Sequence, residues 1–338
     1  MIGKKKMGLL LSGLLSISLL VGCGSGGTSN NDSGTKTGDV KEIGVIQLIQ
    51  HSALDSANKG FVEGLKEKGY EEGKNIKIEQ QNAQGKIDTA QQIAGQFVSS
   101  KKDLIFAIAT PSAQAAYNAT KDIPVVFTAV TDPVADNLVA SLENSGNNLT
   151  GTSDMANIEE QLDLYTKVLP NMKTLGIIYT TSETNSVNQV NILKELAPKY
   201  NLTIKEIGIA NINEISQNLN SALGDIDALY APTDNNVAAS YEQVAQIALS
   251  KNVPVLGAEP AVVEVGGLIS KGIDYFELGK MAGEKAALVL DGKKPSEVPV
   301  ETMPELAITI NTAVADKLGI KISDDILNNA TKVTGGVK

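Results

Sequence analysis

Several short polar clusters in this chain follow runs of β-branched and aliphatic residues, and their side chains could hold a small charged molecule. The first half of the chain contributes four such clusters, at Gln50 to Asp55, Thr110 to Ser112, Thr131 to Pro133, and Ser153 with Asp154. The second half contributes three more, at Thr184 to Ser186, Thr233 to Asn235, and Glu259. Hydroxyl, amide and backbone N–H groups can bind a carboxylate, whereas an aspartate can bind an ammonium group. Together the clusters predict a site for a zwitterion.

The chain contains no arginine, so the usual bidentate partner of a carboxylate is missing. We therefore expect the carboxylate of the ligand to be bound by hydroxyls and helix N-termini, at Thr110, Ser112, Asn185 and Ser186. The ammonium group would pair with an aspartate, for which Asp234 is the first candidate and Asp132 the second.

Each of these residues also has a purely structural alternative, because Ser, Thr, Asn and Asp are the preferred N-caps of any helix. Ser186 and Gln189 fit a capping box, which would leave N–H groups of that helix free to face a ligand. His51 and Asp55 are weaker candidates, since a lone His–Asp pair on a loop is usually a local hydrogen bond. The clustering of so many polar residues after strands favours the functional alternative.

The composition disfavours several other kinds of function. The formal net charge of −10 argues against a nucleic-acid partner. One histidine and one cysteine cannot build a closed zinc site, and no metal or cofactor is expected. The chain has no GxSxG, GxxxxGK[ST] or HExxH motif, so an enzyme would lack the common nucleophile, phosphate-binding or metal-binding signatures.

From Glu42 onward, short β-branched runs alternate with segments of helical periodicity. Strands are expected at 42–49, 75–81, 103–109 and 123–130, and a last strand at 306–311. Pro111 fits the first turn of a helix, where its missing N–H costs nothing. Such alternation predicts βαβ units and parallel sheets that are covered on both faces.

The same pattern occurs twice along the chain. Gly44-Val45-Ile46 returns as Gly176-Ile177-Ile178, and the strand at Lys77 as the one at Thr203. The segments at Asp103 and Ile123 likewise return at Asp227 and Val253. These landmarks keep their order and nearly their spacing, which predicts two doubly wound lobes rather than one large sheet.

The chain left after the second repeat is too short for a third lobe, so it should complete the first two. We expect a first lobe at 42–154 plus 275–298 and a second at 155–274 plus 299–332. The chain would then cross between the lobes several times, which predicts a multi-strand hinge.

The N-terminal sequence predicts that the protein is located outside the cytoplasm. Residues 1–22 read as a signal peptide, with three lysines before an apolar run that is short for a membrane span. The run ends at Leu20-Val21-Gly22-Cys23, which resembles a bacterial lipobox. That resemblance implies cleavage before Cys23 and a diacylglycerol group on its thiol. Residues 23–41 are polar and glycine-rich, as expected for a flexible tether.

Seven stretches of the chain carry a resemblance to a known family. They are HSALD, DLIFAIATPSAQAA, IPVVFTAVTDPV, NNLTGTSD, LGIIYTTSETNSV, PTDNNV and GIDYFELG. In this order they resemble the tryptophan/tyrosine ABC transporter substrate-binding protein family, which has the type I periplasmic-binding-protein fold. The family typically has proline at Ser52, a basic residue, often arginine, at Lys59, and small hydroxyl residues near Glu259 and Pro260.

The resemblance implies that the protein captures an aromatic or other hydrophobic amino acid between its lobes. It also implies delivery to a permease and an ATPase. We expect the protein to be a monomer that is anchored through its lipid to the outer face of the cell membrane. The residues implied to line the cleft are Leu54, Asp55, Thr110, Ser112, Thr131, Asp132, Ser153, Asn185, Ser186, Asp234 and Asn235.

Two other classes of function remain open. One is an enzyme, which the missing motifs disfavour. The other is a binding protein or sensor of the same fold for a sugar or nucleoside, because one fold serves many ligands. Sugar sites usually stack rings on aromatic residues, and this chain has no tryptophan. A transcriptional regulator would need an N-terminal DNA-binding module, and the lipobox stands in that position.

Overall fold

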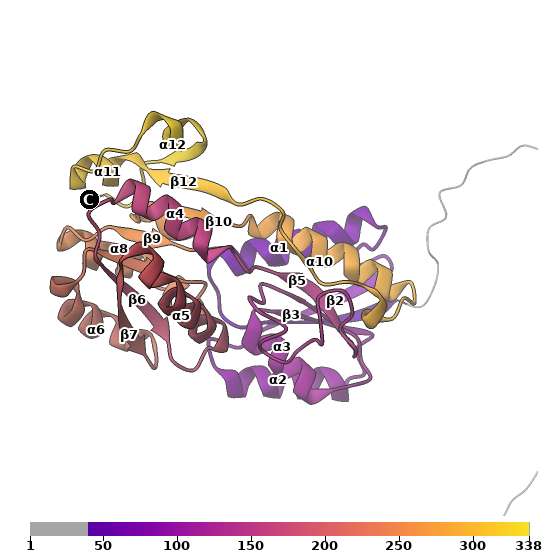
Figure 1. Ribbon diagram of the computed structural model, residues 1–338. Coiled ribbons are helices and arrows are strands. Elements are labelled where there is room, and N and C mark those ends of the chain that lie inside the picture. Colours follow the sequence, from indigo (N-terminus) through magenta and orange to yellow (C-terminus); the bar gives the residue numbers. More distant parts are fainter. Residues whose placement is uncertain (1–39, 338) are drawn as a thin grey trace, which may run out of the picture. The chain divides into compact units, whose positions relative to one another are not determined.

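The computed structural model describes residues 40–337. The predicted signal peptide, Cys23 and nearly all of the predicted tether lie outside these described residues. Strand β1 (Lys41–Gln47) begins one residue before the predicted start of the first lobe. None of the helices in the described part is long and apolar enough to cross a membrane. The strands form two sheets, each packed against helices (Figure 1).

The first sheet has six strands, all parallel, in the order β11-β5-β4-β3-β1-β2. Besides β1 they are β2 (Ile76–Asn82), β3 (Leu104–Ile108), β4 (Val125–Thr128), β5 (Leu149–Ser153) and β11 (Glu301–Thr302). Every residue of β3, β4 and β5 is buried, as expected for parallel strands that are covered on both faces. The four strands predicted between residues 42 and 130 are confirmed.

Helices cover both faces of the first sheet. They are α1 (Ser52–Glu67), α2 (Ile87–Ser99), α3 (Thr110–Ala119) and α10 (Tyr275–Leu290). On one face, the ring of Phe61 in α1 stacks on that of Phe106 in β3, with centroids 3.6 Å apart. On the other face, Phe97 of α2 packs so closely on Gly44 of β1 that a Cβ there would lie 2.5 Å from the ring. These three buried rings anchor the helices to the sheet.

Helices α1 and α10 pack backbone to backbone through glycines, and they lie side by side in Figure 1. Gly60 and Gly64 of α1 face α10, and Gly279 and Gly283 of α10 face α1. A Cβ at Gly279 would lie 1.9 Å from the carbonyl oxygen of Ala57. At the other three glycines a Cβ would lie 2.0–2.2 Å from a carbonyl oxygen of the opposite helix. All of these distances are far inside van der Waals contact, so no side chain fits at these positions.

The second sheet has seven strands in the order β13-β12-β10-β9-β8-β6-β7. They are β6 (Thr174–Thr180), β7 (Thr203–Ile209), β8 (Ala228–Ala231), β9 (Val255–Gly257), β10 (Ile269–Gly272), β12 (Ala307–Asn311) and β13 (Ala330–Val333). All neighbours run parallel except β10 and β12, which pair antiparallel. Its helices are α4 (Ile158–Val168), α5 (Thr184–Leu196), α6 (Ile215–Ala222), α7 (Asn235–Ala238), α8 (Tyr241–Ser250), α9 (Ala261–Glu264), α11 (Thr312–Leu318) and α12 (Asp324–Asn328).

The two sheets share one strand order, as the repeated sequence pattern predicts. The order β2-β1-β3-β4-β5 in the first sheet corresponds to β7-β6-β8-β9-β10 in the second. The repeated glycine also has the same role in both sheets. A Cβ on Gly176 would lie 2.6 Å from Cδ1 of Ile226, much as one on Gly44 would meet Phe97. Each glycine leaves room for a large apolar side chain against the middle of its sheet.

The chain passes between the two sheets three times, after β5, after β10, and between β11 and β12. These crossings form the multi-strand hinge that the sequence predicts. The third crossing comes later than the predicted boundary between residues 298 and 299. Val298 and Val300 are buried in the core of the first sheet, and Glu301–Thr302 pair with β5. Because these valines complete the first core, the chain leaves that sheet only after Thr302.

Candidate functional site

The carboxyl ends of the two sheets face each other, and polar side chains make contact across them. Thr131 follows β4 and Thr233 follows β8, and their buried hydroxyl oxygens lie 3.1 Å apart. Nε2 of His51, just before α1, lies 3.5 Å from Oδ1 of Asn235, the first residue of α7. This edge is where open α/β sheets bind their ligands.

A small cavity lies between the two sheet edges. Its volume of about 10 Å³ is enough for about one water molecule. Five residues that the sequence predicts as ligand contacts line it: Leu54, Thr131, Asn185, Asp234 and Asn235. Its other lining residues are His51, Ala129, Asp154, Thr233, Glu259 and Tyr275.

Two buried acids face this cavity from different sheets. Asp154 follows β5, and its Oδ2 accepts a hydrogen bond of 2.8 Å from the hydroxyl of Tyr275. Glu259 follows β9, and its Oε1 accepts one of 2.5 Å from the hydroxyl of Tyr241. The second oxygen of each acid, Oδ1 of Asp154 and Oε2 of Glu259, is buried and has no hydrogen-bond partner. Such atoms are costly unless something else binds them.

Burial controls the charge state of these groups. It raises the pKa of the Glu259 carboxyl to about 8, and the negative charges of Asp154 and Asp234 add to the rise. It also raises the pKa of Asp154, against the opposing effects of the hydroxyl groups of Tyr275 and Thr131. For His51, burial lowers the pKa to about 4, so the imidazole is neutral at pH 7. The cavity lining therefore contains acids and no positively charged side chain.

Asn185 adds a third unpartnered acceptor to the cavity. It lies in the first turn of α5, and only 2% of its surface is exposed. Its Nδ2 donates to the carbonyl oxygen of Thr233 at 2.7 Å. That bond fixes the orientation of the carboxamide and leaves Oδ1 without a partner. Asn185, which the sequence predicts as a contact of the ligand carboxylate, therefore lines the cavity with a free acceptor atom.

Asp234, the first candidate for the ammonium group, already has its carboxylate oxygens occupied. Oδ2 accepts from the backbone N–H of Thr180 at 2.5 Å and from the hydroxyl of Ser186 at 2.7 Å. Oδ1 accepts from the hydroxyl of Thr180 and the N–H of Val237, both at 2.9 Å. Burial raises the pKa of Asp234, and these four bonds oppose that rise. The residue caps α7 and ties it to β6, which is the structural alternative to ligand binding.

The predicted capping box at Ser186 and Gln189 is wrong. Helix α5 begins at Thr184, and no side chain caps it. Ser186 lies inside the first turn, where its hydroxyl donates to Asp234 instead. The amide of Gln189 donates to Oγ1 of Thr233 at 2.5 Å and to the carbonyl oxygen of Asn185 at 3.1 Å. The hydrogen bonds that Ser186 and Gln189 make to Asp234 and Thr233, just before α7, thus replace those of the predicted capping box.

The start of α3 has the features of an anion site. Pro111 lies in its first turn, as predicted, and no side chain caps the helix. The hydroxyl oxygens of Thr110 and Ser112 are buried without a partner. Ala109, just before the helix, has φ 81°, and Ala129, just after β4, has φ 54°. Such φ values are strained for alanine and are typical of functional sites.

Two other predicted contact residues have structural partners. Oδ1 of Asp132 accepts from the backbone N–H of Ala135 at 2.9 Å, which caps a turn. The hydroxyl of Ser153 donates to the carbonyl oxygen of Thr131 at 2.8 Å and accepts from the N–H of Met155 at 3.1 Å. Neither residue lines the cavity. Both hold the backbone that carries Thr131 and Asp154.

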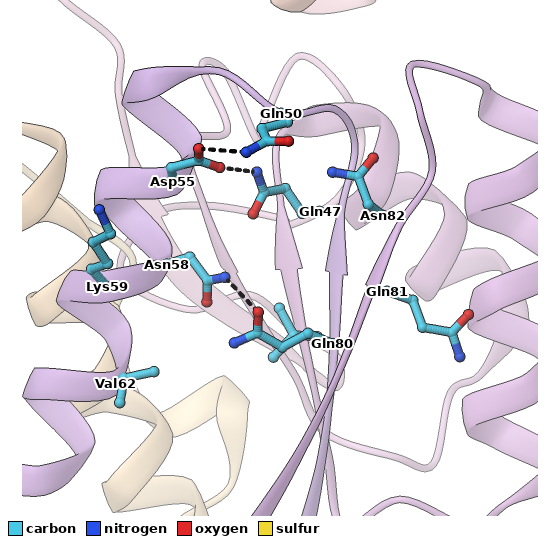
Figure 2. Close-up of a pocket in the computed structure, with 10 residues that line it drawn as sticks. Gln47, Gln50, Asp55, Asn58, Lys59, Val62, Gln80, Gln81 and Asn82 are labelled. Atoms are coloured by element: carbon cyan, nitrogen blue, oxygen red, sulfur yellow. Dashed lines mark hydrogen bonds between the residues drawn. The ribbon is translucent and has the colours of Figure 1, made fainter.

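Asp55 faces a different space from its neighbour Leu54. Figure 2 shows it directed toward the amides of Gln47 and Gln50, which lie 2.7 and 3.4 Å from its two oxygens. These residues line an open groove of about 750 Å³ between α1 and strands β1 and β2. One helix turn thus places Leu54 at the interlobe cavity and Asp55 in the groove. These two amides are the hydrogen-bond partners of the Asp55 carboxylate.

Tyr241 and Tyr275 were not among the residues predicted from sequence. Each orients one cavity acid by donating its hydroxyl hydrogen to it. The position of Tyr275, directly after the second crossing between the sheets, could have marked it as a residue of the candidate site. No sequence pattern marks Tyr241, because it begins α8 with the periodicity of a core residue.

Comparison with known proteins gives a consistent match. A family described as ABC transporter substrate binding protein matches residues 42–334. A tyrosine-binding protein of Clostridioides difficile is 47% identical over 326 residues, which are 95% of this chain and 94% of that protein.

Two solved structures show how the described fold compares. An ABC domain in complex with L-Trp from Streptococcus pneumonia is 37% identical, with a TM-score of 0.84 over 87% of this chain and 100% of that one. The ligand-free, open structure of a substrate binding protein with adhesive properties from Clostridium difficile is 46% identical. It covers 88% of this chain and 100% of its own, yet its TM-score is only 0.68.

Proposed function

The chain belongs to the ABC transporter substrate binding protein family, and from this premise we propose that its interlobe cavity captures an aromatic amino acid. The protein is a substrate-binding protein of an ABC transporter, so its partners are a small-molecule ligand and a permease. Substrate-binding proteins of ABC importers are extracytoplasmic. The family consists of transport binding proteins, so we propose no catalytic activity for this chain.

The observation that carries the ligand proposal is a set of three unpartnered acceptors at one cavity. Oδ1 of Asp154, Oε2 of Glu259 and Oδ1 of Asn185 are buried and lack hydrogen-bond partners. An ammonium group carries three N–H donors and one positive charge. It would therefore satisfy three acceptors and place a positive charge beside two acids in one step.

The carboxylate of the same ligand is assigned to the start of α3. There Thr110 and Ser112 have free hydroxyls, and the uncapped first turn offers backbone N–H groups. Leu54, Thr131 and Asn235 also line the proposed site. Ser153, Ser186 and Asp234 position the residues around it, whereas Asp55 and Asp132 lie outside the cavity lining.

The aromatic side chain of the ligand is proposed from the relatives, one named for tyrosine and one solved with L-Trp. A cavity of about 10 Å³ is too small for any amino acid, so the lobes must separate to admit one. Closure would follow only when the contacts of both lobes engage the ligand.

Free tyrosine or tryptophan is expected to raise the melting temperature of the purified 40–338 domain. At a ligand concentration 100 times Kd, the gain is about 2.7 kcal/mol, or about 5 °C for a domain of this size. N-acetyltyrosine, which lacks the ammonium group, and a polyol such as inositol serve as controls. Stabilisation by the polyol but by no amino acid would instead support a binding protein for sugars.

Attachment to the membrane is proposed to depend on Cys23, the single cysteine of the chain, which ends the lipobox-like segment. Cys23→Ala is expected to release the protein into the soluble fraction, because it removes the thiol that would carry diacylglycerol. We expect the released protein to be a monomer. Ligand binding by the folded part should be unchanged. If the variant still fractionates with membranes after a salt wash, another anchor holds the protein.

A further inference from the structure

The two cavity acids repel each other when both are ionised. Asp154 comes from the end of the first sheet and Glu259 from the end of the second. Both residues line one cavity, and each has an unpartnered carboxyl oxygen. Only 3% of Asp154 and 2% of Glu259 is exposed. Two carboxylates that face one small buried space repel each other, since little water is present to screen them.

The groups that face Glu259 offer it no compensating positive charge. Tyr241 of α8 donates a hydrogen bond to it, and Tyr230 of β8 and Tyr275 of α10 lie close enough to feel its charge. Asp154 and Asp234 add negative charge from two further segments. His51, before α1, is the one basic residue of the lining, and burial keeps its imidazole neutral. A proton is therefore the simplest way to relieve the repulsion.

We propose that the ammonium group of the ligand enters this cavity in exchange for a proton carried by Glu259. This inference rests on the proposed function, because it assumes an amino-acid ligand. Before the exchange, the carboxyl of Glu259 keeps its proton beside the carboxyl group of Asp154. When the ammonium group hydrogen-bonds to both acids, the O–H bond of Glu259 breaks and the proton passes to the solvent buffer. The ligand keeps all three of its N–H bonds.

The direction of the pH dependence follows from this exchange. Without the ligand, burial holds the pKa of Glu259 at about 8. With an ammonium group beside it, the pKa falls, because a nearby positive charge favours the carboxylate. The complex then binds fewer protons than the free protein at pH values between the two pKa values. Affinity therefore rises with pH in that window and levels off above about pH 8.

Calorimetry on the wild-type protein tests the exchange without any variant. The heat of binding is measured at pH 7 in buffers with different ionisation enthalpies, such as phosphate and Tris. A carboxyl with a pKa of about 8 is about nine-tenths protonated at pH 7. About 0.9 proton should therefore be released for each ligand bound. Kd should also fall by up to about tenfold per unit between about pH 5.5 and 7.5. Equal heats in all buffers together with a Kd that does not depend on pH would overturn the exchange.

Two variants identify the group that releases the proton. Glu259→Gln, which cannot release it, should bind with the same heat in every buffer and with a flat pH profile. Glu195→Gln changes an exposed glutamate on α5 and should keep the wild-type behaviour. Proton release that persists in a folded Glu259→Gln protein would contradict the assignment. Binding of amino acids without proton release would sink this inference alone, whereas no binding at any pH would sink the proposed function.

Discussion

Gly279→Val is expected to destabilise the protein by about 3 kcal/mol or more. The position lies where α10 touches the backbone of α1, and a Cβ there would lie 1.9 Å from the carbonyl oxygen of Ala57. A valine needs more than a small shift of a neighbouring side chain, because the obstacle is helix backbone. The two helices would have to separate along a contact that also covers β4 and β5. Urea unfolding followed by circular dichroism measures the loss.

A matched glycine provides the control for this variant. Gly95 lies inside α2, and a Cβ there would meet no atom within 4 Å. Gly95→Ala should leave stability unchanged or raise it by about 0.5–1 kcal/mol, since alanine loses less backbone entropy in a helix. If Gly279→Val unfolds at the wild-type urea concentration, α1 and α10 do not pack as closely as the structure shows.

Asp154→Asn is expected to weaken binding of the amino acid by about one to two orders of magnitude. The change keeps the shape of the side chain and removes its charge. A hydrogen bond to a charged group contributes about 1.5–3 kcal/mol, which corresponds to that loss of affinity. Stability should change little, because the Asn oxygen can still accept the hydrogen bond from Tyr275. Titration calorimetry and urea unfolding on the same protein separate the two effects.

Asp234→Asn is the matched variant with the opposite expectation. All four hydrogen bonds to Asp234 come from donors of the chain itself, at Thr180, Ser186 and Val237. An Asn at this position turns an NH₂ group toward buried donors, which should cost about 3 kcal/mol of stability. If Asp234→Asn loses the ligand while keeping full stability, and Asp154→Asn binds normally, the ammonium partner is Asp234, as the sequence prediction has it.

The fold was largely predictable from sequence because its signals are local and repeated. The buried β-branched runs, Pro111 at the start of a helix and the doubled Gly-Val-Ile pattern each depend on a few neighbouring residues. The third crossing was placed too early because its position depends on where Val298 and Val300 are buried. Such burial is a long-range property that no local pattern carries.

The general position of the candidate site was also predictable, since polar residues after parallel strands share one edge of a sheet. Which of these residues are free to bind a ligand was not predictable, because that depends on hydrogen-bond partners far away in the sequence. Asp234 is occupied by Thr180 and Ser186, which lie about 50 residues earlier in the chain. Asp154 and Glu259 have a free oxygen because Tyr275 and Tyr241 reach only one oxygen of each acid.

The glycine contact between α1 and α10 has a consequence for how the chain is made. More than half of the chain, with five of the seven strands of the second sheet, is synthesised after α1 and before α10. Until residue 275 has emerged from the ribosome, Gly60 and Gly64 have no surface to pack against, and β4 and β5 lack the helix that covers them. The first lobe therefore cannot be completed before most of the second exists. Any polypeptide that ends before α10 would expose an uncovered apolar sheet, so incomplete chains should be poorly soluble and quickly degraded.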